Sequence, residues 1–204
     1  MASRPLIVRN GEVEDPLALA LGFLERYSGS DIVDASGPMS FDEQDLRAAN
    51  RGGARIAAVE IAAVLERRSG IERVLRTIPP ETSLLGPSAA IPWAPLTRLF
   101  DAFAGIRGVG FSKMTKALHP KRPALIPMLD SVVQKYLGDD LGPRSSLSFG
   151  ERATALVCSY KRDLDRNRVA LRALRRELAR RGYPVTEVRL LDLVIWSVWA
   201  ENAM

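Results

Sequence analysis

A short glycine-containing turn between two predicted helices is the first feature of this sequence that could do chemistry. Gly108 and Gly110 lie two residues apart in this turn, and glycine permits positive φ angles and close approach of the backbone to another molecule. A turn that opens a helix directs unpaired N–H groups outward at the positive end of the helix dipole, which suits a phosphate group. Arg107, Lys113 and Lys116 add positive charge nearby. The turn is therefore a candidate phosphate site, although many helical hairpins use glycine only to turn.

The segment from Phe103 to Val133 resembles the helix–hairpin–helix DNA glycosylase superfamily. Its turn, Ile106-Arg-Gly-Val-Gly110, is similar to the Leu-Pro-Gly-Val-Gly hairpin of that family. The family has an aspartate after the hairpin, at the start of a helix. Here Asp130 follows Gly110 by 20 residues, within the sequence Ile-Pro-Met-Leu-Asp-Ser-Val-Val. The Pro-x-Leu-Asp form looks most like the adenine-excising branch.

The resemblance implies the activity of a DNA glycosylase, which removes a modified or mispaired base after flipping it out of the duplex. Asp130 would stabilise the oxocarbenium-like transition state and activate the attacking water. The hairpin would hold the flanking phosphates and so bind duplex DNA without sequence preference. An aspartate that starts a helix is also the usual N-cap, worth about 1 kcal/mol, and the two roles are compatible. The phosphate contacts implied by the resemblance are Arg107, Gly108, Val109, Gly110, Ser112, Lys113 and Lys116.

Some positions depart from the family pattern. Members that also cleave the DNA strand carry a Schiff-base lysine two residues after the second hairpin glycine, where this chain has Ser112. Lys113 is one position further, about 100° around the helix, so we expect it to point elsewhere. The resemblance therefore implies a monofunctional enzyme that uses no cofactor and no metal. Trp93, which precedes the hairpin, is either part of the base pocket or a half-buried core residue.

The chain has one cysteine and one histidine, which excludes several kinds of site. Cys158 alone cannot form an intrachain disulfide, nor hold the four-cysteine iron–sulfur cluster that many relatives in the resembled family carry. Together with His119 it supplies two of the four ligands that a structural zinc site needs. We expect His119 to cap backbone carbonyls or to face solvent.

Positive charge is concentrated in one stretch near the C-terminus. The chain of 204 residues has a net charge of +5, and residues 161–181 hold nine Lys/Arg against three Asp/Glu. The rest of the chain is therefore slightly acidic. A concentrated basic stretch favours a polyanionic partner, nucleic acid first. The alternative is a solvated helix, because an apolar stripe at helical spacing would pack inward: Leu164, Leu171, Leu174 and Leu178.

Helical signals dominate and predict an all-α fold of about nine helices. The hairpin motif is expected at about 94–118, as a helix over 94–104, a turn, and a helix over 111–118. Strand-like runs such as Leu6–Val8 are too short to build a sheet. The other predicted helices are 16–27 with an end at Ser28-Gly29, a short helix capped by Ser40 with Glu43 completing a capping box, 54–68 ended by Gly70, 130–137, 149–165, 167–181 and 186–201.

We expect one compact two-lobed unit over residues 1–204. Residues 71–150 would form the hairpin and active-site core, and residues 1–70 with 151–204 the second lobe. The most apolar run, Leu190–Ala200, is interrupted by Asp192 and is too short for a transmembrane helix, and the N-terminal run is too short for a signal peptide. These features predict a cytoplasmic protein without membrane contact.

Two further functions are compatible with the sequence. A non-catalytic helix–hairpin–helix nucleic-acid-binding protein would bind phosphate through its hairpin, while Asp130 only caps its helix. A helical interaction protein would bind an acidic protein partner through its basic face. A glycosylase requires a pocket beside Asp130, whereas a binding module requires only a basic surface.

Overall fold

The computed structural model describes residues 5–9, 11–26, 36–138 and 146–201. Within these ranges the chain forms ten α-helices, two short 3₁₀ helices and one pair of strands, which confirms the predicted all-α class. In chain order the elements are β1 (Leu6–Val8), β2 (Gly11–Val13), α1 (Pro16–Arg26), α2 (Glu43–Arg51), α3 (Ala58–Leu65), α4 (Arg68–Leu75), η1 (Ser88–Ala90), α5 (Trp93–Asp101), α6 (Phe111–Leu118), η2 (His119–Lys121), α7 (Ser131–Leu137), α8 (Phe149–Arg166), α9 (Arg168–Arg180) and α10 (Glu187–Glu201).

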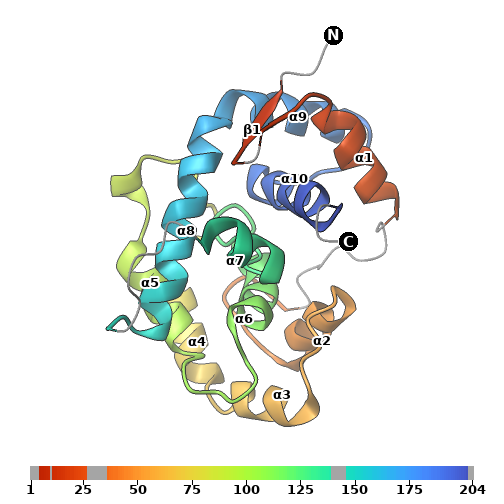
Figure 1. The fold of residues 1–204 in the computed structure, drawn as a ribbon. Helices are drawn as coiled ribbons and strands as arrows, with labels where there is room; N and C mark the ends of the chain where they lie inside the picture. Colours follow the sequence, from red (N-terminus) through yellow and green to blue (C-terminus); the bar gives the residue numbers. More distant parts are fainter. Residues whose placement is uncertain (1–4, 10, 27–35, 139–145, 202–204) are drawn as a thin grey trace.

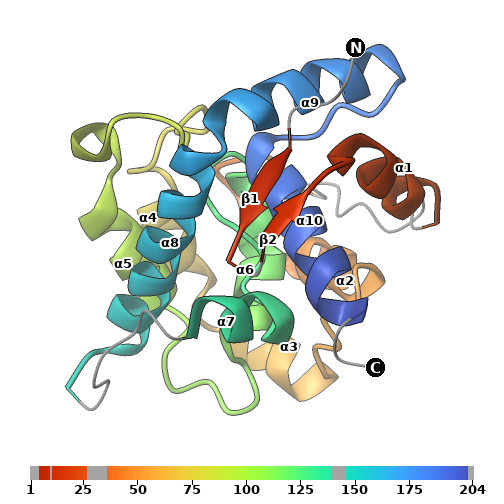
Figure 2. The same ribbon diagram turned by 45° about the horizontal axis from the view of Figure 1, so that its top comes forward.

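The helices form two groups (Figures 1 and 2). Helices α1, α9 and α10 lie with the two strands at one end of the molecule, and α2 to α6 lie toward the other. Helix α8 runs along one side and packs against α5, while α7 lies between the groups and packs against α10. Helix α2 packs against α3 and α6, whereas α1 packs against α9 and α10. The division into lobes 71–150 and 1–70 with 151–204 stays a prediction.

Strands β1 and β2 form a small sheet where the sequence predicts none. They pair antiparallel, with Leu6 opposite Val13, and the side chains of Leu6 and Val8 are buried in the core. The amide of Asn167 completes the edge, because its Nδ2 donates to Ile7 O (2.8 Å) and its Oδ1 accepts from Ile7 N (2.7 Å). A distant side chain therefore takes the place of a third strand, which no local pattern reveals.

The predicted N-cap of α2 is wrong by two residues. Asp42 is the N-cap and Asp45 closes the capping box, whereas the sequence suggested Ser40 with Glu43. Asp45 is buried and also accepts a hydrogen bond from Lys121 Nζ at 2.7 Å. This tertiary ion pair fixes which of the neighbouring acidic residues closes the cap.

The predicted helix over 54–68 is shorter in the structure, where α3 covers only Ala58–Leu65. Helix α4 (Arg68–Leu75) follows it where the sequence predicts the helix to end, which adds one helix to the expected number. The side chain of Asn50 bonds both N and O of Ile56 (2.6 and 2.9 Å) and so keeps the residues after α2 extended. Helix α3 therefore begins only at Ala58. Gly70 lies inside α4 and does not end a helix.

The remaining helices agree with the sequence patterns. Helices α5 and α6 form the predicted hairpin over 94–118, and α7 to α10 match their predicted ranges within one or two residues. Helix α1 matches as far as Arg26, and its predicted end at Tyr27 to Gly29 lies outside the described residues. None of the described helices is both long enough and apolar enough to cross a membrane.

Two buried cations fix the segment that leads from α6 to α7. Lys121 pairs with Asp45 of α2, and both side chains are almost fully buried. The guanidinium of Arg122 is also buried and donates to Ile78 O (2.8 Å) and Leu75 O (2.6 Å), at the end of α4. Buried charges are tolerated only when paired and hydrogen-bonded. These contacts tie the start of the segment to two helices of the lower group.

Candidate functional site

A hollow of about 290 Å³, here called the central cavity, opens between the two groups of helices. Helices α1 and α10 line one side, and α2, α6 and the segment leading into α7 line the other. Its size is near the lower end of the range for ligand pockets, about 300–1,000 Å³. Its walls include two aromatic rings and five ionisable side chains: Phe23, Trp196, Arg51, Lys116, Asp130, Arg189 and Asp192.

Asp130 lies at the wall of the central cavity as the N-cap of α7. Its Oδ1 accepts hydrogen bonds from Val132 N and Val133 N, both at 3.0 Å. No hydrogen bond reaches its Oδ2 within the described residues, so this oxygen is available to a ligand. The backbone before it is fixed by α6, because Leu129 N donates to the buried Thr115 Oγ1 at 2.9 Å. One carboxylate oxygen thus caps the helix while the other is free for chemistry.

A second carboxylate, Asp192 of α10, lines the same cavity but lies deeper. Its side chain is 3% exposed, and its Oδ2 accepts from Met128 N at 3.1 Å. Burial raises the pKa of Asp192 to about 7; the charge of Asp130 acts in the same direction, while Arg189 and the Met128 N–H oppose it. In the sequence Asp192 was noted only as an interruption of an apolar run. That isolated acid in an apolar helix was the one signal that could have identified it.

Three cations complete the charged lining, namely Arg51, Lys116 and Arg189. Lys116 Nζ donates to Gly52 O at 3.2 Å, and burial lowers its pKa, with Arg189 and Arg55 adding to the effect and Asp130 opposing it. The guanidinium of Arg189 lies 5.9 Å from the ring centre of Phe23. The sequence predicted Lys116 as a phosphate contact of the turn. Instead, its position on the last turn of α6 brings it into the central cavity.

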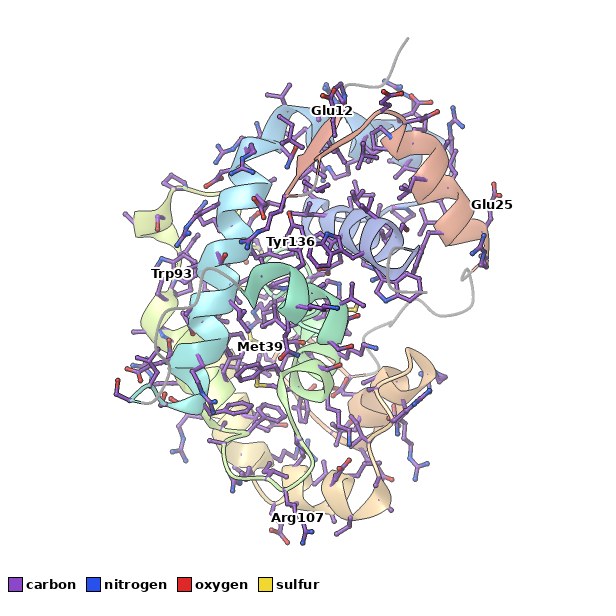
Figure 3. The ribbon with its side chains drawn as sticks, in the orientation of Figure 1. Glu12, Glu25, Met39, Trp93, Arg107 and Tyr136 are labelled. Atoms are coloured by element: carbon purple, nitrogen blue, oxygen red, sulfur yellow. The ribbon has the colours of Figure 1, made fainter. Side chains whose placement is uncertain are left out.

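The aromatic side of the central cavity is formed by Phe23 and Trp196, whose rings meet edge to face at 5.5 Å. Trp196 is partly buried and lines the cavity. Trp93, the suggested pocket residue, does not line it: its Nε1 donates to Ser88 O at 3.0 Å, and it lies at one side of the molecule (Figure 3). The aromatic wall therefore comes from the two terminal helices.

The hairpin turn contains the expected positive φ at Gly108 (83°), whereas Gly110 has φ −95° and caps α6. Gly108 faces a carboxylate of the chain itself, because a Cβ there would overlap Glu60 Oε1. The same carboxylate accepts two hydrogen bonds from Lys113 Nζ (2.6 and 2.7 Å). Lys113 is therefore neutralised internally and points away from the central cavity, as its position predicted.

Other parts of the turn face solvent. Arg107 and Gly110 are exposed, and Arg107 projects at the end of the molecule in Figure 3. Val109 is buried, and its N–H donates to Ile106 O at 3.1 Å. Gly110 and Ser112 stand at the start of α6, where the first N–H groups have no partner inside the helix. Of the predicted phosphate contacts, these exposed groups are the ones a ligand can reach.

The basic stretch lies far from this turn. Helix α9 is at the opposite end of the molecule from the α5–α6 turn (Figures 1 and 2). The apolar stripe of the basic stretch is buried, as the alternative interpretation predicted: Leu164 on α8, and Leu171, Leu174 and Leu178 on α9. Several of its arginines pair with acids of the chain, including Arg168 with Asp165 and Arg175 with Glu187. Its charge therefore does not add to that of the hairpin.

His119 is buried and does not face solvent. Its Nδ1 lies 2.6 Å from Ile126 O, which agrees with the expected bond to a backbone carbonyl, and burial lowers its pKa to about 4. Burial also keeps the Cys158 thiol neutral, because it raises the pKa of that group. In the described ranges, no three His, Cys, Asp or Glu side chains gather in a group that could hold a metal ion.

The fold and the central cavity define an all-α protein with a mixed-charge pocket between two groups of helices. A family model matches residues 22–198, which include nearly every residue of the cavity and the hairpin. The chain belongs to this family, a family of unknown function named DUF6308. No curated protein and no solved structure matches the chain.

Proposed function

We propose that this protein is a monofunctional DNA glycosylase, which hydrolyses the N-glycosidic bond of a flipped modified or mispaired base. The observation that carries the proposal is the central cavity beside Asp130. A nucleic-acid-binding module needs no such hollow, whereas a glycosylase needs one to receive the flipped base.

The two sides of the central cavity suit the two parts of a nucleotide. The rings of Phe23 and Trp196 offer apolar and aromatic surface against which a base can stack. The free Oδ2 of Asp130 provides a negative charge where an oxocarbenium-like sugar develops positive charge. Arg51 at the cavity and the exposed start of α6 supply positive groups for the phosphates on either side.

Replacing Asp130 with Asn tests the catalytic assignment. Asparagine caps helices as well as aspartate does, so folding and DNA binding should be unchanged while excision falls by at least about 100-fold, as expected for loss of a charge-stabilising group. The measurement is the rate of alkali-labile site formation in end-labelled duplexes that carry deaminated, methylated or mispaired bases.

Asp15→Asn is the matched control, because the Asp15 carboxylate accepts from Ala18 N (3.0 Å) at the start of α1. It makes the same chemical change at another helix start and should leave excision unchanged. Normal excision by Asp130→Asn would disprove the catalytic role. If the wild type binds DNA in a salt-sensitive manner but excises nothing from the panel, the protein is a non-catalytic binder.

A further inference from the structure

The two carboxylates of the central cavity lie at different depths. Asp130 is partly exposed, whereas Asp192 is 3% exposed. The Asp192 carboxylate accepts a hydrogen bond from Met128 N, two residues before Asp130. A flipped nucleotide enters a pocket base first, because its sugar stays attached to the backbone outside. Asp192 therefore faces the base end of the cavity, and Asp130 faces the sugar end.

Asp192 has hydrogen-bonding capacity that the described part of the chain does not use. Its Oδ1 is buried and accepts from no donor there. The hydroxyl of Tyr160 donates to Val188 O at 2.6 Å. It lies close enough to Asp192 to lower the pKa of that carboxyl slightly, but Oδ1 accepts no hydrogen bond of normal geometry from the described residues. Buried polar atoms without a partner are rare and call for an explanation, such as a catalytic role.

We propose that Asp192 is the general acid that protonates the departing base, and that the central cavity therefore takes neutral purine bases. This inference rests on the proposed glycosylase function. Purines keep ring nitrogens with free lone pairs, such as N7, that can accept this proton. A neutral purine leaves the sugar slowly unless it is protonated first.

The reaction balances in atoms and charge. Asp192 gives the proton on its carboxyl group to a ring nitrogen of the purine. The C1′–N9 bond then breaks, and its electron pair leaves with the base. Water adds its oxygen to C1′ and gives a proton to Asp130, and exchange with solvent returns both carboxyl groups to their starting states.

The surroundings of Asp192 raise its pKa so far that about half of the carboxyl is still protonated at pH 7. Burial is the main cause of its raised pKa of about 7, and the nearby charge of Asp130 contributes. Arg189 on its own helix opposes the shift, Tyr160 faces it from α8, and Lys116 faces the same cavity from α6. Two carboxyl groups whose environments separate their pKa values are the usual arrangement for an acid and a stabilising anion in one site.

The experiment compares two classes of leaving base in wild type, Asp192→Asn and Asp130→Asn. One set of end-labelled duplexes carries neutral purines, namely hypoxanthine and mispaired adenine; the other carries 7-methylguanine, which is already a cation and needs no protonation. We expect Asp192→Asn to lose about 10²–10⁴-fold in single-turnover rate on neutral purines and little on 7-methylguanine. Asp130→Asn should lose activity on both.

The pH dependence is a second readout that a structural role would not change. Wild-type excision of neutral purines should fall as pH rises through about 7, because the acid loses its proton, while excision of 7-methylguanine stays level. Equal losses on both substrate classes, or no loss on neutral purines, would overturn the role of Asp192.

Failure of the glycosylase function itself would look different, because wild type would then excise no base at all. In that case the binding of free adenine, hypoxanthine and guanine to wild type and Asp192→Asn, measured by calorimetry at pH 6 and pH 8.5, decides the inference about the cavity. Weaker binding at pH 8.5 than at pH 6, seen in the wild type only, would support a protonated Asp192 that donates to the purine. Absence of binding, or the same pH dependence in the variant, would overturn it.

Discussion

Burial holds two ionisable side chains, His119 and Asp192, in their neutral forms. The pKa of Asp192 rises from 3.8 to about 7 because of burial, so the folded state keeps a proton that the unfolded chain releases between these values. Stability from this group is therefore lost as pH rises toward 7. The pKa of His119 falls from 6.5 to about 4, so its contribution has the opposite sign and is lost as pH falls below 6.5.

The two opposing contributions predict a flat stability profile in the wild type between about pH 5 and 6.5. In Asp192→Asn the His119 contribution is no longer opposed by Asp192, and the free energy of unfolding should rise by about 1 kcal/mol per pH unit over this range. Urea denaturation at several pH values measures the slope. A flat profile in the variant would show that His119 is not held neutral in the fold.

The residues of the central cavity also show which functional side chains can be identified from the sequence. Asp130 was identifiable because an N-cap signal and the spacing from Gly110 are both local. Asp192, Lys116 and Trp196 were not assigned to one pocket, because their meeting depends on how α6 and α10 pack across the central cavity.

At the scale of the elements, the hairpin has two glycines with different constraints. Gly108 has a positive φ and faces Glu60, so any side chain there is strained and meets the carboxylate. Gly110 has an ordinary φ, and a Cβ there meets no atom within 4 Å. Substitution of Gly110 therefore changes access to the start of α6 without disturbing the fold.

We predict that Gly110→Asp weakens duplex binding while keeping or raising stability. Aspartate is a favoured N-cap, so its carboxylate would occupy the first N–H groups of α6 and repel phosphate. Filter binding with duplexes of unrelated sequence should show a similar loss for each. The control is Gly70→Asp, the same charge change at an exposed glycine of the neighbouring α4. Equal affinities of the Gly110 variant and wild type would argue against phosphate binding at the hairpin.

The boundaries of the elements show the same division between local and distant causes. Helices α7 to α10 follow their apolar spacing and caps, such as Ser148 with Glu151 at α8. The break between α3 and the residues before it depends on Asn50, whose side chain holds Ile56. A polar side chain that bonds the backbone can override a helical pattern.

At the scale of the whole molecule, the fold separates two positive regions that the sequence alone could not place. The exposed Arg107 and the cavity residue Arg51 belong to the half of the molecule that holds the hairpin, while α9 lies at the other end (Figures 1 and 3). A short duplex that places a base in the central cavity and phosphates at the hairpin does not need α9.

Two double variants that each remove two positive charges test this arrangement. Arg51→Gln with Arg107→Gln should weaken duplex binding and lower the slope of log affinity against log salt by about 2, since each phosphate contact contributes about 0.9. Arg172→Gln with Arg176→Gln, on the exposed face of α9, should change both quantities far less. A larger loss from the α9 pair would mean that nucleic acid binds across α9.

The sequence by itself determined the all-α class, the helical hairpin, the cap at Asp130 and the inward stripe of α9. These features depend on interactions within a few residues, namely helical hydrogen bonds, caps and the 3.6-residue repeat. Only the tertiary structure decided that Phe23, Lys116 and Asp192 share one cavity, and that Glu60 neutralises Lys113 53 positions away. Contacts between distant segments follow from how the apolar faces pack together, and residue spacing along the chain carries no record of that packing.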